Sequence, residues 1–89
     1  MHAHDHPSIR AVGVEGHDAE AVHRLAALSG RKAPTGAVLL AELAGDPVAA
    51  IGIFDGNIIT DRVRSDLRLV LRLHLERLFA LSVIAVIGV

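Results

Sequence analysis

The clearest pattern in the chain is a pair of apolar runs on either side of a polar turn. The runs cover residues 37–43 and 48–54, each about seven residues, which is a normal strand length. Residues 44–47 between them read Ala-Gly-Asp-Pro, a turn composition. Neither run alternates between apolar and polar positions, which is typical of strands covered on both faces. A second turn signal at residues 55–57 and an apolar return at 58–60 complete a predicted antiparallel meander with helices or a partner on each side.

Upstream of the meander, the pattern predicts a strand followed by a helix. Residues 8–14 read SIRAVGV and fit a short first strand. Asp18 is expected to cap a helix over residues 19–29, where apolar side chains recur at helical spacing. Gly30 is expected to end this helix, and residues 31–35 form a connector to the meander.

The last third of the chain has a mixed signal. Its leucines recur at every second position, which is the period of a strand. Leucine is not β-branched and the run is long, so we predict a helix that begins near Asp66 and is capped by Ser65 or Asp61. Because leucine then occupies so much of the circumference, this helix must bury more than one face. The leucines concerned are Leu67, Leu69, Leu71, Leu73 and Leu75.

These elements predict an α+β fold in the order β-α-β-β-(β)-α. An antiparallel meander packs against an N-terminal helix and a long C-terminal helix. We expect a flexible His-rich tail over residues 1–7, a β-α-β-β unit over residues 8–61, and an apolar C-terminal helix or tail over residues 62–89.

Residues 78–89 form an uncharged apolar run, LFALSVIAVIGV. A membrane-spanning helix needs about 20 apolar residues, so this run alone is too short. Three interpretations remain open: the end of a core helix or a strand, a contact with a partner or a second copy, or a peripheral membrane tail with Arg68, Arg72 and Arg77 at the headgroups. The candidate interaction residues are Leu78, Phe79, Leu81, Val83, Ile84, Val86 and Ile87.

The amino-acid composition argues against several classes of function. The 89 residues allow one small domain, and 52% apolar residues argue against a disordered chain. A net charge of −1 with 2% aromatic residues argues against nucleic-acid binding. The absence of cysteine excludes disulfides and thiolate chemistry. The polar start of the chain lacks the apolar segment of a secretory signal, so we expect a cytoplasmic protein, peripheral to the membrane if the C-terminal run binds lipid.

Candidate chemical groups are few. His2, His4 and His6 could bind Ni²⁺, Cu²⁺ or Zn²⁺ through their imidazoles, although a solvated chain terminus is the interpretation we adopt, with no metal site expected. Glu42 is the one acid inside a predicted strand and could act as a base if buried, or simply face water. Neither group predicts a catalytic site.

Several short motifs resemble the first half of the GNAT-type N-acetyltransferase superfamily. Residues 9–12 (IRAV) and 18–25 (DAEAVHRL) look like its opening strand and helix. Residues 38–42 (VLLAE) and 45–50 (GDPVAA) resemble the hairpin that follows. Small bacterial proteins that resemble only this first half share patterns like LAALS and DGNIITD, with Arg62 standing where their pattern has proline.

The resemblance implies an acetyl-CoA site that this chain does not carry. The superfamily binds the cofactor's pyrophosphate with a glycine-rich loop at a helix N-terminus, but the only glycine after Asp61 is Gly88. The chain also lacks any tyrosine for the family's general acid. We therefore expect no cofactor and a non-catalytic small protein that associates with itself or with a partner chain. The alternatives are a fragment or subunit of an acetyltransferase whose cofactor site is supplied elsewhere, and a membrane-associated protein anchored by its apolar C-terminus.

Overall fold

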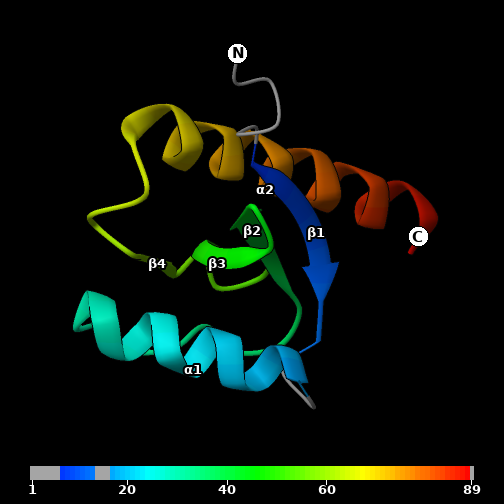
Figure 1. Cartoon of the computed structure of the whole chain (residues 1–89). Coiled ribbons are helices and arrows are strands. Elements are labelled where there is room, and N and C mark those ends of the chain that lie inside the picture. Colours follow the sequence, from blue (N-terminus) through cyan, green and yellow to red (C-terminus); the bar gives the residue numbers. More distant parts are fainter. Residues whose placement is uncertain (1–6, 14–16, 89) are drawn as a thin grey trace.

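The computed structural model describes residues 7–13 and 17–88 and shows one antiparallel sheet between two helices (Figure 1). The four strands lie in the order β1-β2-β3-β4, with α1 on one face of the sheet and α2 on the other. The α+β prediction and its element order are confirmed. The elements are β1 (Ser8–Val12), α1 (His17–Ser29), β2 (Val38–Leu43), β3 (Asp46–Gly52), β4 (Ile58–Thr60) and α2 (Leu67–Ile87).

The two central strands are apolar on both faces because each face is covered by a helix. Along β2, Val38 and Leu40 belong to the cluster under α1, whereas Leu39 and Ala41 belong to the cluster under α2. Successive side chains of a strand point to opposite faces, so a continuous apolar run supplies both layers. The two-sided cover predicted from the sequence is therefore present.

The hairpin between β2 and β3 is tighter than the four-residue turn predicted from the sequence. Leu43 pairs with Asp46, which leaves only Ala44 and Gly45 in the loop. Both have positive φ angles, 53° and 85°, which is the geometry of a type I′ hairpin turn. Pro47 enters the strand next to a register shift in β2, the kind of position where a sheet accepts proline.

The predicted cap of the first helix is wrong. The helix α1 begins at His17, so Asp18 lies inside its first turn rather than before it. The Asp18 carboxylate instead accepts a hydrogen bond from Arg10 of β1 at 2.9 Å. The Asp18 carboxylate, predicted from the sequence to cap α1, thus forms an ion pair between β1 and α1 instead.

The predicted caps of the second helix are also wrong by a few residues. Asp66 is the N-cap of α2, and its side chain accepts a hydrogen bond from the Leu69 backbone N–H at 2.9 Å. Asp61 and Ser65 are engaged with each other, since the Ser65 hydroxyl donates to the Asp61 carbonyl at 2.8 Å. That local turn leaves Asp66 as the first side chain free to cap.

Residues 67–76 are helical, as chosen over the strand interpretation. Within α2, Leu69 and Leu73 are buried against the sheet, one helical turn apart. The leucines that alternate with them, Leu67, Leu71 and Leu75, are exposed. The alternation in sequence therefore divides the leucines between two sides of one helix.

Leu73 is fully buried between α2 and the sheet, so its truncation should destabilise the fold. We expect Leu73→Ala to lower the free energy of unfolding by about 2–5 kcal/mol, because it removes buried methyl groups and leaves a cavity. Leu28→Ala in α1 is the matched control, since Leu28 is exposed and should cost less than about 0.5 kcal/mol. Urea unfolding at low protein concentration measures both, and equal losses would contradict this account of the core.

Candidate functional site

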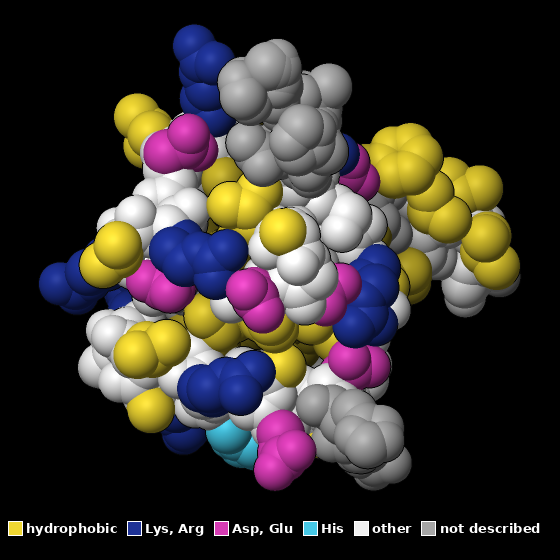
Figure 2. Space-filling model, viewed as in Figure 1, with side chains coloured by type: hydrophobic (Ala, Val, Ile, Leu, Met, Phe, Trp, Pro, Cys, Tyr) yellow, Lys and Arg dark blue, Asp and Glu magenta, His cyan; other side chains and the backbone are white. Residues whose placement is uncertain are grey.

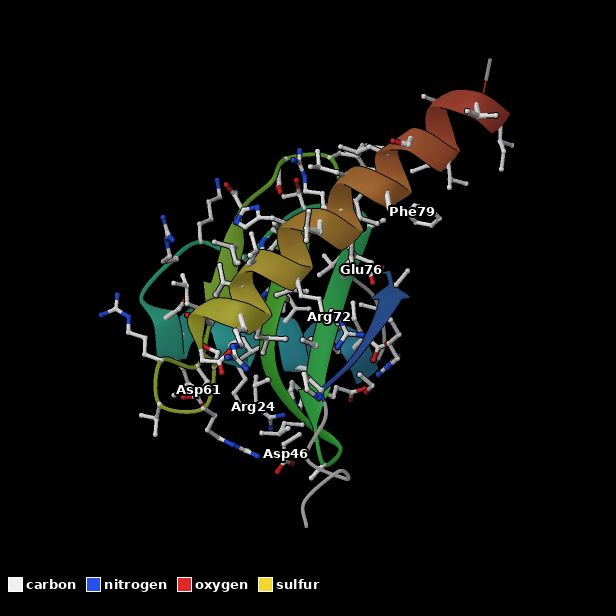
Figure 3. The ribbon with its side chains drawn as sticks, turned by 90° about the horizontal axis from the view of Figure 1, so that it is seen from above. Arg24, Asp46, Asp61, Arg72, Glu76 and Phe79 are labelled. Carbon is white, nitrogen blue, oxygen red and sulfur yellow. The ribbon has the colours of Figure 1, made fainter. Side chains whose placement is uncertain are left out.

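The helix α2 has one side that holds it to the sheet. Leu69 and Leu73 are buried, and Ala80 and Leu81 further along the helix pack against the same cluster while remaining partly exposed. This side ends near Leu81, because the C-terminal end of α2 projects beyond the strands (Figure 3). The sheet therefore covers only part of the helix.

The opposite side of α2 carries a row of large apolar side chains that are each more than half exposed. Leu71, Leu75 and Leu78 are 59%, 57% and 56% exposed, and neighbouring Phe79 is 68% exposed. Leu67 continues the row toward the helix N-terminus. We call these five residues the outer face of α2. Single exposed apolar residues are ordinary, but a contiguous row is typical of an interaction site.

The candidate interaction residues of the sequence all lie on α2 beyond Glu76. Leu81 is partly buried as a core contact, and the others are exposed. Figure 2 shows hydrophobic side chains gathered at the C-terminal part of α2. Exposed fractions fall to 40% and 42% at Val83 and Ile84, whose neighbours Val86 and Ile87 are more exposed. Sequence reasoning missed Leu67, Leu71 and Leu75 as members of the same surface. The signal was their spacing, since a helix with leucine at every second position cannot turn all of them toward one sheet.

Arg77 fixes the middle of α2 to the sheet. Its Nε atom donates to the backbone carbonyls of Gly52 and Ile53 at 3.2 and 2.9 Å. The Gly52 carbonyl at the end of β3 also accepts from the Gly56 N–H at 3.0 Å, so Arg77 is a second donor there and joins the helix to the turn after β3. The bond sets the helix's rotation as well as its position, because Arg77 lies on the side toward the sheet and thereby keeps the outer face turned away.

The turn that receives Arg77 is held together by Asp55. Its carboxylate accepts hydrogen bonds from the backbone N–H of Thr35 and of Asn57, each at 2.9 Å, and from the Thr35 hydroxyl at 3.2 Å. Burial raises the pKa of Asp55, but these hydrogen bonds and the charge of Arg77 outweigh it and leave the pKa below its ordinary value. The carboxylate form is thus the one that the fold stabilises.

Asp55→Asn should therefore make stability less dependent on pH in acid. The folded-state pKa of Asp55 is lowered, so its contribution is present above its ordinary pKa of 3.8 and is lost as the pH falls through the folded value. We expect the variant to be less stable at pH 7, by no more than about 1 kcal/mol because the group is exposed. The difference should shrink below pH 4. Thermal unfolding at pH 7 and pH 3 measures it, and a constant difference would show that the carboxylate charge plays no part.

Glu42 is part of an ion-pair cluster at the edge of the sheet. Arg10 donates to Glu42 and to Asp18, each at 2.9 Å, and so joins β1, β2 and α1. The hydrogen bond to Glu42, followed by that to Asp18, raises the pKa of the Arg10 guanidinium. Glu42 is held by a cation at the surface, which suits a structural role rather than that of a base.

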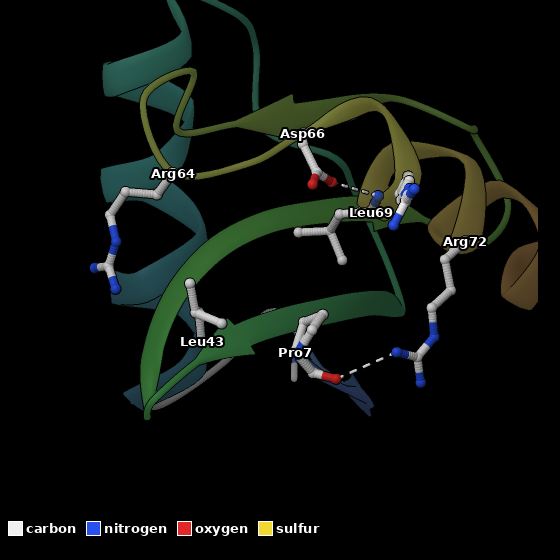
Figure 4. Close-up of a pocket in the computed structure, with 7 residues that line it drawn as sticks. Pro7, Leu43, Arg64, Asp66, Leu69 and Arg72 are labelled. Carbon is white, nitrogen blue, oxygen red and sulfur yellow. Dashed lines mark hydrogen bonds between the residues drawn. The ribbon is translucent and has the colours of Figure 1, made fainter. Parts of the chain in front are cut away.

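A hollow at the N-terminal end of α2 is lined by three arginines, but most of its polar groups already have partners (Figure 4). Arg64 pairs with Asp46 at 3.2 Å, and Arg72 donates to the Pro7 carbonyl at 3.3 Å. Asp66 caps the helix in the same hollow. Arg68 alone among these arginines has no hydrogen-bond or carboxylate partner within the described residues. Among the arginines of this hollow, Arg68 is thus the one available to bind another molecule beside the outer face.

The weak metal candidates His2, His4 and His6 lie outside the described residues. Among residues 7–13 and 17–88, no group of three or more histidine, aspartate or glutamate side chains is placed to hold a metal ion. Within that same part of the chain, no helix has both the length and the apolar composition needed to cross a membrane.

Comparison with models of protein families, with curated proteins and with solved structures finds no match to this chain. The likeness to the first half of an acetyltransferase therefore rests on the short sequence motifs, and it stays a prediction. The outer face of α2 is the surface on which the described residues concentrate exposed apolar area, and it is the candidate functional site.

Proposed function

We propose that this chain is a small non-catalytic protein that works by associating with another protein chain, its own copy or a partner, through the outer face of α2. The observation that carries the proposal is the row of Leu71, Leu75 and Leu78, each more than half exposed on the side of α2 away from the sheet. No packing requirement of this fold places leucine there, because Leu69 and Leu73 already cover the sheet.

The size of this surface supports association. A helix of 21 residues is about 31 Å long and about 10 Å wide with its side chains, so one whole side presents roughly 300 Å² in projection, of which the outer face from Leu67 to Phe79 makes up about two-thirds. Contiguous apolar patches of about 300–600 Å² are often functional on otherwise monomeric proteins. Removing such area from water is favourable at about 25 cal/mol per Å². Burial of this surface favours association, and because the area is small the association should be weak and reversible.

A membrane surface is the second candidate, because Arg68 and Arg72 flank the same leucines. Cations beside an apolar helix face are typical of helices that lie on anionic lipid. Association with protein is favoured here because α2 is itself packed on the sheet through Leu73 and Arg77, so only a narrow strip is available to lipid. The acetyltransferase alternative would instead show as one-site binding of acetyl-CoA in a calorimetric titration.

Replacing two central leucines of the outer face should abolish association without unfolding the protein. We expect wild type to sediment above the monomer mass at high concentration, and Leu75→Glu/Leu78→Glu to sediment as a monomer with an unchanged far-UV circular dichroism spectrum. The physical reason is that charges in an apolar contact cannot be paired there. Sedimentation equilibrium over a range of concentrations measures the mass.

Leu28→Glu is the matched control, since Leu28 of α1 is 62% exposed but lies on the other side of the molecule. This variant should associate like wild type. A wild-type chain that is monomeric at every concentration contradicts the self-association form of the proposal. Wild type that also pellets with anionic vesicles, while Leu75→Glu/Leu78→Glu does not, would favour the membrane candidate.

A further inference from the structure

The spacing of leucines and small residues on the side of α2 away from the sheet follows the pattern of a coiled-coil seam. Leu71, Leu75, Leu78, Ser82 and Ala85 are separated by steps of four, three, four and three residues, and all five are exposed. Such steps are those of the a and d positions that meet a partner helix. Leu69 and Leu73 fall on the other side of the helix, toward the sheet. The seam is therefore available to a second helix without disturbing the fold.

We infer that the chain which covers this seam is a second copy of this protein, with the two α2 helices antiparallel. This inference rests on the proposed function and adds the partner and the direction of pairing. In an antiparallel pair the a positions of one helix meet the d positions of the other. Leu75 then lies opposite Leu78 of the second copy, and Leu71 lies opposite Ser82.

Side-chain size favours the antiparallel direction. The seam is large in its first half, with Leu71 and Leu75, and small in its second half, with Ser82 and Ala85. Opposing a large side chain with a small one fills each layer evenly, as a well-packed contact requires. In a parallel pair Ser82 would face Ser82 and Ala85 would face Ala85, so the second half of the contact would be hollow. The side-chain sizes along the seam are thus complementary to those of the same seam running in the opposite direction.

Charge favours the same direction. The arginines of α2 lie in its first half, at Arg68 and Arg72, and at its middle, at Arg77, and no basic residue lies in its last turn. Antiparallel pairing brings Arg68, which has no partner within the described residues, opposite Ala85, beside the last-turn carbonyls of the second helix. A helix C-terminus carries partial negative charge and is stabilised by a nearby cation. Parallel pairing would instead set Arg68 against Arg68.

Arg72 and Phe79 supply a further contact at the margin of the seam. Both side chains extend from the same side of α2, with Glu76 between them (Figure 3), and both line a shallow hollow with Leu75. In the antiparallel register, Arg72 of one copy lies beside Phe79 of the other. An arginine over an aromatic ring is an attractive pair, and the two-fold symmetry forms it twice.

The contact is small for a stable dimer. Standard interfaces bury about 800 Å² per partner, whereas a single helix side offers less. We therefore expect a dissociation constant on the order of micromolar. Part of the affinity comes from Arg68, so the dimer should weaken as salt rises.

Single cysteines test the direction, because the natural chain contains no cysteine. We would prepare Leu71→Cys and Ser82→Cys separately and treat each alone, and an equal mixture, with a short thiol-to-thiol crosslinker above the dissociation constant. The mixture should give a covalent dimer several-fold more abundant than either variant alone. The reason is that position 71 lies opposite 82, whereas two copies of position 71 are eleven residues apart along the pair, about 16 Å. Lys32→Cys, on an exposed connector away from α2, is the control and should not crosslink.

The outcomes separate this inference from the proposed function. Efficient crosslinking of Leu71→Cys with itself would overturn the antiparallel direction in favour of a parallel pair, with association through α2 intact. Wild type that dimerises in sedimentation, with no crosslink in any cysteine sample, would overturn the seam as the contact. Wild type that stays monomeric and binds only vesicles would overturn both the second copy and the protein-association form of the proposed function.

Discussion

Burial on both faces of one small sheet is the constraint on which this structure depends. Leu40 and Ala41 are neighbours in β2 and both are fully buried, one beneath α1 and the other beneath α2. With only two helices in the described chain, each must cover a whole face. The second face is covered by Leu69 and Leu73, and burying each leucine is worth about 1.5–3 kcal/mol. Without α2, the apolar side chains of Ala49 and Ile51 would face water.

The same constraint explains the exposed leucines. The sheet is short, so α2 packs on it between Leu69 and Leu81 and continues beyond it (Figure 3). Arg77 and the Asp55 turn fix which side of the helix faces the strands. Everything on the opposite side is left in solvent, and there the chain carries leucine and phenylalanine rather than lysine and glutamate. A helix that only had to cover the sheet would not need them.

Most of the fold could be predicted from local pattern, because continuous apolar strands, turn residues and helical stripes each reflect short-range rules. The caps could not, since the Asp18 carboxylate pairs with Arg10 and the Asp61 carboxylate accepts from the Val63 N–H, contacts that the sequence does not display. The position of the outer face was predicted only in part. Leucine at every second position indicated two buried sides, but the rotation of α2, and so the exposure of Leu71 and Leu75, depends on Arg77 reaching the carbonyls of Gly52 and Ile53.

The central claim is that one side of α2 holds the sheet while the other meets a second copy. Nuclear Overhauser effects between chains test it directly, in an equal mixture of leucine-methyl-labelled and unlabelled protein above the dissociation constant. We expect contacts between chains from the methyl groups of Leu71, Leu75 and Leu78, and none from those of Leu25 and Leu40, which are buried within one copy. Contacts between chains confined to Leu28 of α1, or none from the outer face in a sample that is dimeric, would contradict the account.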